Sequence, residues 1–393
     1  MSSKGWNVLK IGNIGRIVTG KTPPTQYAEN FGNKYPFITP RDMSGQKRIN
    51  QTERYLSEKG KNEVKNCLLP VNAICVSCIG SDMGKVVMTT TNSITNQQLN
   101  SIICNDSFNP DFIYYALVNI SSGLRNIGHN STAVPILNKT DFSNFEISVP
   151  DIFTQRRIAE ILSALDDKIE LNRQTNATLE AIAQAIFKEW FVDFNFPGAT
   201  GEMVESELGM IPKGWRVGKL EEIITNFDRK RVPLSSRERE NRKGAFPYYG
   251  AASILDYVDD YIFDGVYLLM GEDGTVITED GKPVLQYVSG KFWVNNHTHV
   301  LQGKKPFSTE YVLLQLKNTN VKHIVTGAVQ PKINQGNMNE LPVVIPDEFT
   351  LLSFQDIITP IFSNVLDTEQ ETSILTGIRD NLLPKLMNGE IEV

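Results

Sequence analysis

An internal repeat constrains the fold of this chain more than any other feature of its sequence. The stretch VPDIFT (149–154) returns as IPDEFT (345–350), 196 positions later (345 − 149) in a chain of 393 residues. Upstream, KGWNVLKIGNI (4–14) is similar to KGWRVGKLEEI (213–223). The same order of similar segments, at spacings of 196 and 209 (213 − 4) positions, predicts two structural units that share one fold.

Each unit begins with a body of mixed strand and helix. Strand-like runs separated by turn residues precede a short helix, expected at 110–120 in the first body and at 308–318 in the second. The expected strands lie at 36–43, 73–80 and 84–91 in the first body and at 261–277 and 291–303 in the second.

A long helical segment follows each body. Spacings of four and three residues from Ile158 define a seam typical of coiled coils, and a helix over the 38 residues 154–191 would be roughly 57 Å long. That seam comprises Ile158, Leu162, Leu165, Ile169, Asn172, Asn176, Leu179, Ala183, Ile186 and Trp190. The repeat places an equivalent seam at Phe354, Ile358, Ile361, Val365, Thr368, Thr372, Leu375, Arg379, Leu382 and Leu386.

Both seams are polar at the centre, with Asn172 and Asn176 in one and Thr368 and Thr372 in the other. If the helices pack antiparallel, these centres meet, and a buried polar pair would fix the register. The alternative is that these residues face solvent at a bend. Pro360 predicts a kink or an early break in the second helix.

The repeated motif also predicts where each long helix begins. Asp151 or Thr154 would cap the first helix, and Asp347 or Thr350 the second, because short polar side chains accept hydrogen bonds from the free N–H groups of a first turn. The motif therefore marks the end of a body and the start of a helix.

Charge and hydropathy bound the class of protein. The net charge of −6 argues mildly against a nucleic-acid partner, but the segment 228–243 holds seven basic and three acidic residues, and DNA binding needs only a local basic surface. No run of 18 or more apolar residues occurs, and the N-terminus lacks the apolar core of a signal peptide. We therefore expect a cytoplasmic protein without a membrane partner.

Metal and catalytic motifs are weak. Cys75 and Cys78 form a CxxC, but they lie in a strand-like run, where positions three apart point to opposite faces. His297 and His299 would share a strand face without a third ligand nearby, so we expect polar surface or core histidines. TPPT (22–25) lacks both ends of the motif that holds the flipped base in amino-methyltransferases, and no P-loop occurs. We expect no metal and no cofactor.

Three segments resemble a known family. GMIPKGWRVGKLEEI (209–223), LEAIAQAIFKEWFVDF (179–194) and IRDNLLPKLMNGEI (378–391) closely resemble the specificity (S) subunits of type I restriction–modification systems. The stretch 155–182 is similar to the central conserved region of that family. The resemblance covers the whole chain; the helical motifs are highly specific, whereas the bodies match mainly in layout.

Together with the repeat, the resemblance implies an α+β fold, in which two mixed α/β target recognition domains are joined by two long antiparallel coiled-coil-like helices with pseudo-two-fold symmetry. The first recognition domain would cover 1–150 and the central conserved spacer helix 151–200. The second recognition domain would cover 201–346 and the C-terminal conserved spacer helix 347–393.

The resemblance also implies a function without catalysis by the chain itself. Each recognition domain would bind one half of an asymmetric bipartite site on double-stranded DNA. The helices would set the gap between the halves and dock two methyltransferase (M) subunits, which endonuclease (R) subunits then join. The chain would direct adenine methylation, or cleavage, by these partners.

Candidate DNA-binding residues lie in loops of both bodies. Amide, hydroxyl and basic side chains read base edges, and Lys and Arg contact phosphates. The first body offers Lys21, Arg41, Ser81, Lys85, Asn96, Gln97, Gln98, His129, Asn130 and Ser131. The second offers Arg229, Lys230, Arg231, Arg242, Lys243, Tyr248, Tyr249, Asn295, Asn296 and His297.

Two alternatives stay open. A standalone DNA-modifying enzyme would transfer a methyl group from S-adenosylmethionine without partners. A scaffold without DNA binding would use the helices for protein assembly only, and it would not enrich one bipartite sequence from random duplexes.

Overall fold

The computed structural model describes residues 5–129, 136–327 and 329–393. The chain divides into two compact units, of which the first runs to Arg173 and resumes at Gln370, and the second contains Gln174–Glu369. Both borders fall inside a long helix. Each unit therefore combines a globular body with parts of both long helices.

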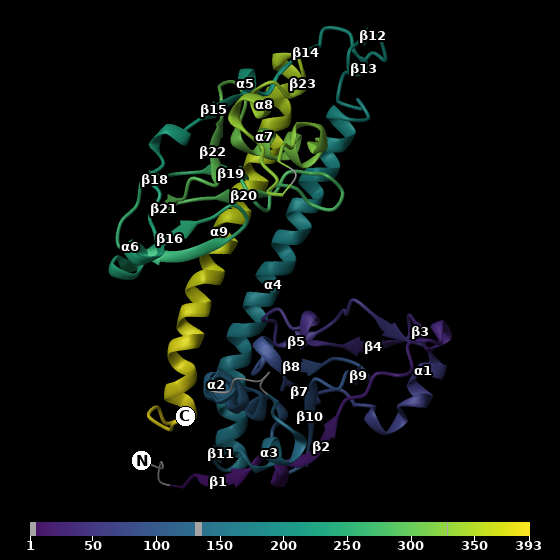
Figure 1. The fold of residues 1–393 in the computed structure, drawn as a ribbon, viewed down its shortest axis with the longest axis vertical. Helices are drawn as coiled ribbons and strands as arrows, with labels where there is room; N and C mark the ends of the chain where they lie inside the picture. Colours follow the sequence, from purple (N-terminus) through teal and green to yellow (C-terminus); the bar gives the residue numbers. More distant parts are fainter. Residues whose placement is uncertain (1–4, 130–135, 328) are drawn as a thin grey trace. The chain divides into compact units, whose positions relative to one another are not determined.

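A five-stranded sheet of order β2-β10-β7-β8-β5 forms the centre of the first unit (Figure 1). Its strands are β2 (Gly15–Thr19), β5 (Arg48–Ile49), β7 (Ile74–Ser77), β8 (Val86–Thr89) and β10 (Leu99–Cys104). Helix α2 (Pro110–His129) packs Phe112, Ile113 and Leu117 into the same core as Ile74 and Ile102. The apolar strand β7 is buried along its whole length, as expected for a central strand.

Smaller elements complete the first body. A second sheet has the order β3-β6-β4-β9, in which β4 and β9 are parallel. The chain closes on itself where β1 (Asn7–Lys10) pairs with β11 (Glu146–Val149). The remaining elements are β3 (Phe31–Gly32), β4 (Tyr35–Ile38), β6 (Tyr55–Leu56), β9 (Ile94–Thr95), α1 (Glu58–Glu63) and α3 (Lys139–Asn144).

The second body repeats this plan. Its central sheet has the order β15-β22-β19-β20, and a second sheet has the order β17-β16-β21-β18, in which β16 and β21 are parallel. The strands are β14 (Arg216–Lys219), β15 (Ile224–Asn226), β16 (Lys243–Tyr249), β17 (Ile254–Val258), β18 (Phe263–Asp264), β19 (Tyr267–Gly271), β20 (Leu285–Val288), β21 (Lys291–Val294), β22 (Thr298–Gly303) and β23 (Pro342–Ile345). The helices are α5 (Leu220–Ile223), α6 (Ser236–Asn241), α7 (Thr309–Lys317) and α8 (Gln335–Asn339).

The repeat is therefore visible in the strand connections. β14 pairs with β23 as β1 pairs with β11, and α7 takes the place of α2 after the last central strand. The hairpin of β12 (Met203–Ser206) and β13 (Gly209–Pro212) precedes the second body. The expected helix at 308–318 is α7, whereas the one expected at 110–120 continues to His129.

The long helices are α4 (Ile152–Phe191) and α9 (Glu348–Met387), with 40 residues each. Asp151 caps α4, because its Oδ1 accepts hydrogen bonds from the backbone N–H of Phe153 (2.9 Å) and Thr154 (3.2 Å). Asp347 caps α9 through the N–H of Thr350 at 3.0 Å. The prediction that the repeated motif starts both helices is confirmed, with the aspartates as the caps.

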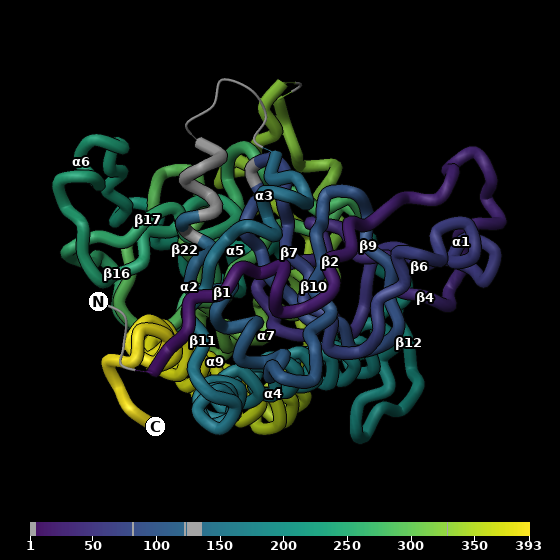
Figure 2. The backbone as a smooth tube through the Cα atoms, turned by 90° about the horizontal axis from the view of Figure 1, so that it is seen from below, coloured from purple at the N-terminus to yellow at the C-terminus, as the bar shows by residue number. Residues whose placement is uncertain are grey.

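Contacts within each unit show that α4 and α9 run antiparallel, and the two helices lie side by side in both views (Figure 1 and Figure 2). In the first unit, Asn172 Nδ2 donates to Thr372 Oγ1 at 3.3 Å, so the polar centres of the seams meet as predicted. In the second unit, Asn176 Nδ2 donates to the Val365 carbonyl at 3.2 Å, and the rings of Trp190 and Phe354 lie 5.7 Å apart.

The early break predicted at Pro360 is wrong, because α9 continues through it. A proline removes one helical N–H and leaves one carbonyl of the preceding turn without its donor. Pro360 lies on the exposed side of α9, where water can satisfy that carbonyl.

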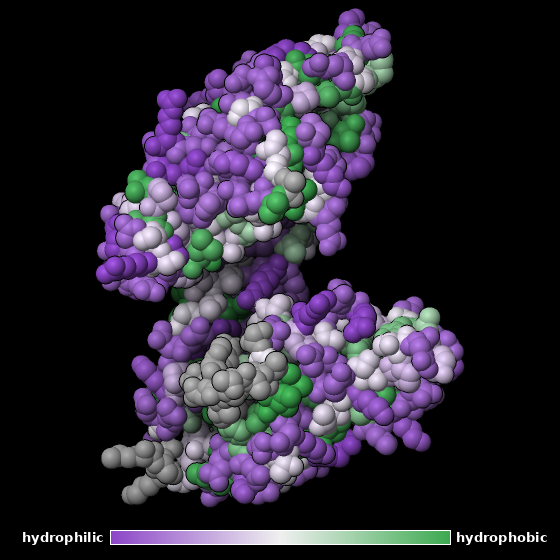
Figure 3. All heavy atoms as spheres, in the orientation of Figure 1, coloured by the Kyte–Doolittle hydropathy of each residue, from purple (hydrophilic) through white to green (hydrophobic). Residues whose placement is uncertain are grey.

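Among the described helices, α9 alone is long and apolar enough to cross a membrane, judged by length and composition only. Some of its apolar side chains lie in the cores of the two units. Phe354 and Ile358 belong to the core of the second unit, and Leu386 and Met387 to that of the first. The faces seen in Figure 3 are mostly hydrophilic. The cores thus account for part of the apolar composition of α9, whereas Leu352, Ile357 and Ile374 are exposed.

The two thiols of the CxxC motif point into different cores, as the strand interpretation predicted. Cys75 packs with Ile38, Ile49 and Val87, whereas Cys78 belongs to the core of α2. Burial raises the pKa of Cys75 to about 12 and that of Cys78 to about 11, so neither is a ready thiolate ligand.

Candidate nucleic-acid interface

Four loops of the first unit meet beside the central sheet. They follow β2 (20–23), β4 (39–43) and β7 (80–85) or connect β9 to β10 (96–98). The Lys21 N–H donates to the Thr95 carbonyl at 3.0 Å, and the Thr22 hydroxyl donates to Gln97 Oε1 at 2.8 Å. Lys85 Nζ donates to the Pro40 carbonyl at 3.3 Å. Predicted residues that lie up to 77 positions apart (98 − 21) are thus gathered into one region.

The side chains of this region differ in their exposure to solvent and in their ion pairing. Lys21, Arg41 and Gln97 are exposed, and neither cation forms an ion pair with any residue that the structure describes. Lys85 is half-buried and pairs with Asp82 at 2.7 Å. Asn96 is buried and shapes the loop, because its Oδ1 accepts the N–H of Gln98 at 3.0 Å.

The side chains of four further candidates are not described. Ser81 lies in the 3-10 turn Gly80–Asp82, and His129 is the last residue of α2, but their side chains are not described. Asn130 and Ser131 lie outside the described residues.

The second unit brings equivalent loops together. The parallel pairing of Ile38 with Thr95 in the first unit corresponds to that of Tyr249 with Val294 in the second. The Asn295 N–H donates to the Tyr249 carbonyl at 3.0 Å, and the Glu272 N–H donates to the His297 carbonyl at 2.9 Å. The same scaffold thus presents two sets of loops with different side chains.

The loops of the second unit also carry exposed basic and amide side chains. Arg229, Lys230, Asn296 and His297 are exposed, and Lys230 Nζ lies 5.2 Å from the centroid of the Phe227 ring. Arg229 forms no ion pair within the described part of the chain. Tyr249 is half-buried.

Acidic neighbours neutralise much of the basic run. Arg242 pairs with Asp259 at 2.9 Å, and Lys243 pairs with Asp256 at 2.6 Å. The sequence shows seven basic residues in this run, but the fold leaves a smaller net positive surface.

Three residues that were predicted to contact DNA form hydrogen bonds within the protein instead. The Arg231 side chain is 14% exposed and donates to Glu272 Oε2 and to the Thr298 carbonyl, both at 2.7 Å. Tyr248 is buried, and its hydroxyl accepts the N–H of Leu234 at 3.0 Å. Asn295 is buried, and its Oδ1 accepts the N–H of His297 at 2.9 Å. We therefore propose structural roles for these residues in place of DNA contact.

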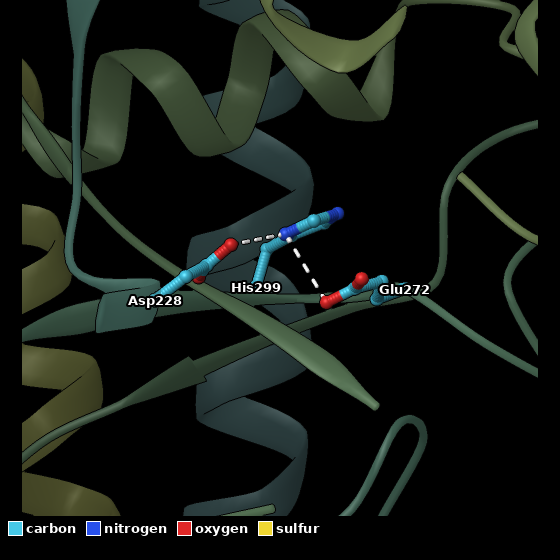
Figure 4. Close-up of side chains that lie close together, drawn as sticks. All are labelled: Asp228, Glu272 and His299. Carbon is cyan, nitrogen blue, oxygen red and sulfur yellow. Dashed lines mark hydrogen bonds and ion pairs between the residues drawn. The ribbon is translucent and has the colours of Figure 1, made fainter. Parts of the chain in front are cut away.

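A buried ionic cluster lies beneath these loops (Figure 4). His299 Nδ1 lies 2.6 Å from Asp228 Oδ2 and 3.7 Å from Glu272 Oε2. His299 Nε2 lies 2.8 Å from the Ile333 carbonyl. Burial alone would raise the pKa of Asp228, but the hydrogen bond and charge of His299, with the Val300 N–H, hold it below its usual value. The Asp228–His299 pair joins residues 71 positions apart, and no local pattern of residues predicts it.

The cluster contains ligand types that bind metals, and their atoms lie within 4.8 Å of one another. The surroundings do not fit a cation. Both ring nitrogens of His299 already face oxygen atoms, and the Arg231 guanidinium lies against both carboxylates. We interpret the cluster as an ion-pair network.

Comparison with known proteins gives matches along most of the chain. Residues 3–181 and 212–379 match the family described as "Type I restriction modification DNA specificity domain". The MjaIX type I restriction enzyme specificity subunit of Methanocaldococcus jannaschii is 29% identical over 412 residues, which cover 99% of this chain and 94% of that protein. The HindI specificity subunit of Haemophilus influenzae is 36% identical over 179 residues, which cover 44% of this chain and 39% of that protein.

Solved structures with a similar fold include an S subunit. The S subunit of a type I restriction–modification system from M. genitalium matches with a TM-score of 0.57 and 18% identity, covering 98% of this chain and 97% of that one.

Proposed function

Since the chain belongs to the family of type I restriction–modification DNA specificity proteins, we propose that it is the non-catalytic subunit that selects the DNA sequence for its partners. Each body binds one half of an asymmetric bipartite site on double-stranded DNA. Such a role also places the protein in the cytoplasm, where the DNA is.

The repeated loop arrangement carries this proposal. Both bodies gather four loops at equivalent strand ends, and the exposed side chains at these places differ: Gln97 in one unit corresponds to Asn296 in the other. Amide side chains at the tips of fixed loops suit base edges, and the exposed cations Lys21, Arg41 and Arg229 suit phosphates. One scaffold with two sets of side chains favours two different half-sites.

We further propose that the long helices act as a coiled-coil-like spacer that sets the gap between the half-sites. The antiparallel contacts of α4 and α9 within each unit, and the polar register at Asn172, support this role.

The helix starts offer places for two methyltransferase subunits, through which an endonuclease subunit would join. Phe153 and Phe349 hold equivalent positions in the repeat and are 77% and 76% exposed. Phe349 also lines a pocket of about 260 Å³ with Phe194, Phe196 and Trp215. An exposed phenylalanine at both copies of one motif favours two copies of one partner.

Sequencing of DNA methylation in the host, with and without this gene, tests the proposal. We expect one modified bipartite adenine motif to disappear with the gene and to return when the gene is restored. Methyl transfer by the purified chain alone would support an enzyme instead, and an unchanged methylation pattern would support a scaffold without DNA binding.

A further inference from the structure

Arg54 carries an exposed positive charge in the first unit, and its position is fixed by aromatic rings. Its side chain forms no ion pair with any residue of the described ranges 5–129, 136–327 and 329–393. The guanidinium carbon lies 5.3 Å from the centroid of the Phe37 ring and 5.7 Å from that of the Phe31 ring. A cation held over two rings loses less freedom when it binds a ligand, so Arg54 is prepared for binding.

Arg54 lies at the edge of the second sheet from which the candidate loops emerge. The N–H of Phe37 donates to the Arg54 carbonyl at 3.0 Å, which places Arg54 beside the end of β4. In the loop that follows β4, Asp42 Oδ1 accepts the N–H of Glu53 at 2.7 Å. Strand β4 also pairs with β9, which leads into the loop that carries Gln97. Arg54 therefore belongs to the candidate interface, although it lies outside the four loops.

An open pocket of about 440 Å³ gives a ligand access to this guanidinium. The residues that line it are Thr25, Phe31, Gly32, Glu53, Arg54 and Tyr55. Glu53 is exposed and, within the part of the chain that the structure describes, is likewise without an ion pair. A guanidinium only donates hydrogen bonds and a carboxylate accepts them, so the pocket offers both kinds of group to one ligand.

This combination suits the major-groove edge of a G·C base pair. Guanine offers the acceptors O6 and N7 to a bidentate arginine, and cytosine offers an amino group to a carboxylate. A phosphate would fit the arginine but would meet the negative charge of Glu53, and like charges repel. The two side chains together favour a base pair over the DNA backbone.

The second unit has the same arrangement at this place, but there the charge is neutralised. Because the parallel strand pairs of the two units correspond, Tyr248 takes the place of Phe37. Asp256 faces Tyr248 across the antiparallel pair of β16 and β17, and so takes the place of Arg54. Arg239 Cζ lies 5.1 Å from the centroid of the Tyr248 ring, but its Nε lies 3.4 Å from Asp256 Oδ2. The two units thus differ in charge at one equivalent position.

We propose that Arg54 is a specificity-determining residue of the first unit, which donates hydrogen bonds to O6 and N7 of a guanine in the first half-site. Glu53 supplies an acceptor beside it for a cytosine amino group. This inference rests on the proposed function. The second unit does not make the contact at the equivalent place, because Asp256 stands there.

Selection from random duplexes by the intact complex with its methyltransferase subunits tests the assignment. Arg54→Met keeps a long apolar stem over the rings but removes the donors, and Arg54→Lys keeps the charge but loses the planar fork. The matched control is Arg16→Met, which changes an exposed arginine near the start of β2, at the strand end opposite to the loop 20–23.

We expect the wild-type complex to select a G·C pair at one position of the first half-site. Arg54→Met and Arg54→Lys should each reduce the preference for guanine there about tenfold or more, whereas the other positions and the second half-site keep theirs. Arg16→Met should select the wild-type motif. Unchanged selection by Arg54→Met would overturn the proposal. So would an equal loss for every duplex that lysine restores, because a lysine also serves a phosphate.

Further measurements separate this inference from a structural role and from the proposed function. Denaturation of the purified chain without DNA should give Arg54→Met a midpoint close to that of wild type, because Arg54 is exposed. A loss of specificity that accompanies a clearly lower midpoint would make Arg54 a structural residue. If wild type and Arg54→Met select the same bipartite motif, the inference alone is rejected. A wild-type complex that selects no sequence rejects the proposed function, and this inference with it.

Discussion

Asp166 of α4 and Arg379 of α9 form an ion pair inside the first unit, with 2.8 Å between Oδ1 and Nη1. The pair is mostly buried, with side-chain exposures of 9% and 23%. The Tyr115 hydroxyl donates to the other Asp166 oxygen at 2.6 Å. Arg379, at a position of the second seam, thus joins the two long helices, and Asp166 joins them to the body through Tyr115.

Arg379→Met should destabilise the protein by about 3 kcal/mol, because it leaves the Asp166 charge buried without its partner. Chemical denaturation of the variant measures this loss. Arg157→Met removes an ion pair whose side chains are 64% and 66% exposed, so it should cost less than about 1 kcal/mol. Equal losses of stability in both variants would contradict a special role for the buried Asp166–Arg379 pair.

Replacement of Arg229 and Lys230 by alanine should weaken binding to all DNA sequences alike. If both contact phosphates, the slope of log affinity against log salt concentration should fall by about 2. Lys213→Ala, which removes an exposed cation from the end of β13, is the control and should leave the slope unchanged. A double variant with the wild-type slope would exclude phosphate contacts at these residues. Arg231→Ala should instead destabilise the second unit, since that side chain is enclosed.

Gln97→Ala should relax specificity at one position of the first half-site, at a cost of about 1–3 kcal/mol for the preferred base. Competition binding with duplexes substituted at each position measures the change. Gln51, an exposed glutamine beyond the edge strand β5, offers the matched control Gln51→Ala. An equal loss for every duplex would identify Gln97 as a phosphate or structural contact.

Phe153→Ala and Phe349→Ala should each weaken docking of one methyltransferase subunit by about 2 kcal/mol without lowering stability, because both rings are exposed. The ratio of subunits in the complex, measured by analytical ultracentrifugation, should fall from two to one in either variant and to none in the double variant. Tyr27→Ala removes another exposed ring and should have no effect. A full complement of partners in the double variant would refute these docking points.

Much of the fold could be predicted because it depends on local patterns. The repeated motif located both aspartate caps, and the spacing of apolar residues located the seams and the antiparallel register at Asn172. Cys75 and Cys78 could be placed on opposite faces because the alternation of faces is a property of a single strand.

The finer features of the candidate site depend on pairing between distant segments. Arg231 looks like part of a solvated basic run, and only the register of β15 with β22 reveals its burial against Glu272. His299 was expected to be a polar surface or core histidine, but its partner Asp228 could not be identified from spacing. A charge in a sequence carries no information about which carboxylates lie nearby.

We propose that the two bodies read two half-sites across a gap that the helices set. Seven residues inserted in helical register after Arg173 in α4, with seven more after Glu369 in α9, would lengthen both helices by about 10 Å, or about three base pairs of DNA. Methylation sequencing of cells that carry this variant should show both half-sites unchanged and the gap longer by about three base pairs. An unchanged gap, or a motif in which a half-site has changed, would contradict the account.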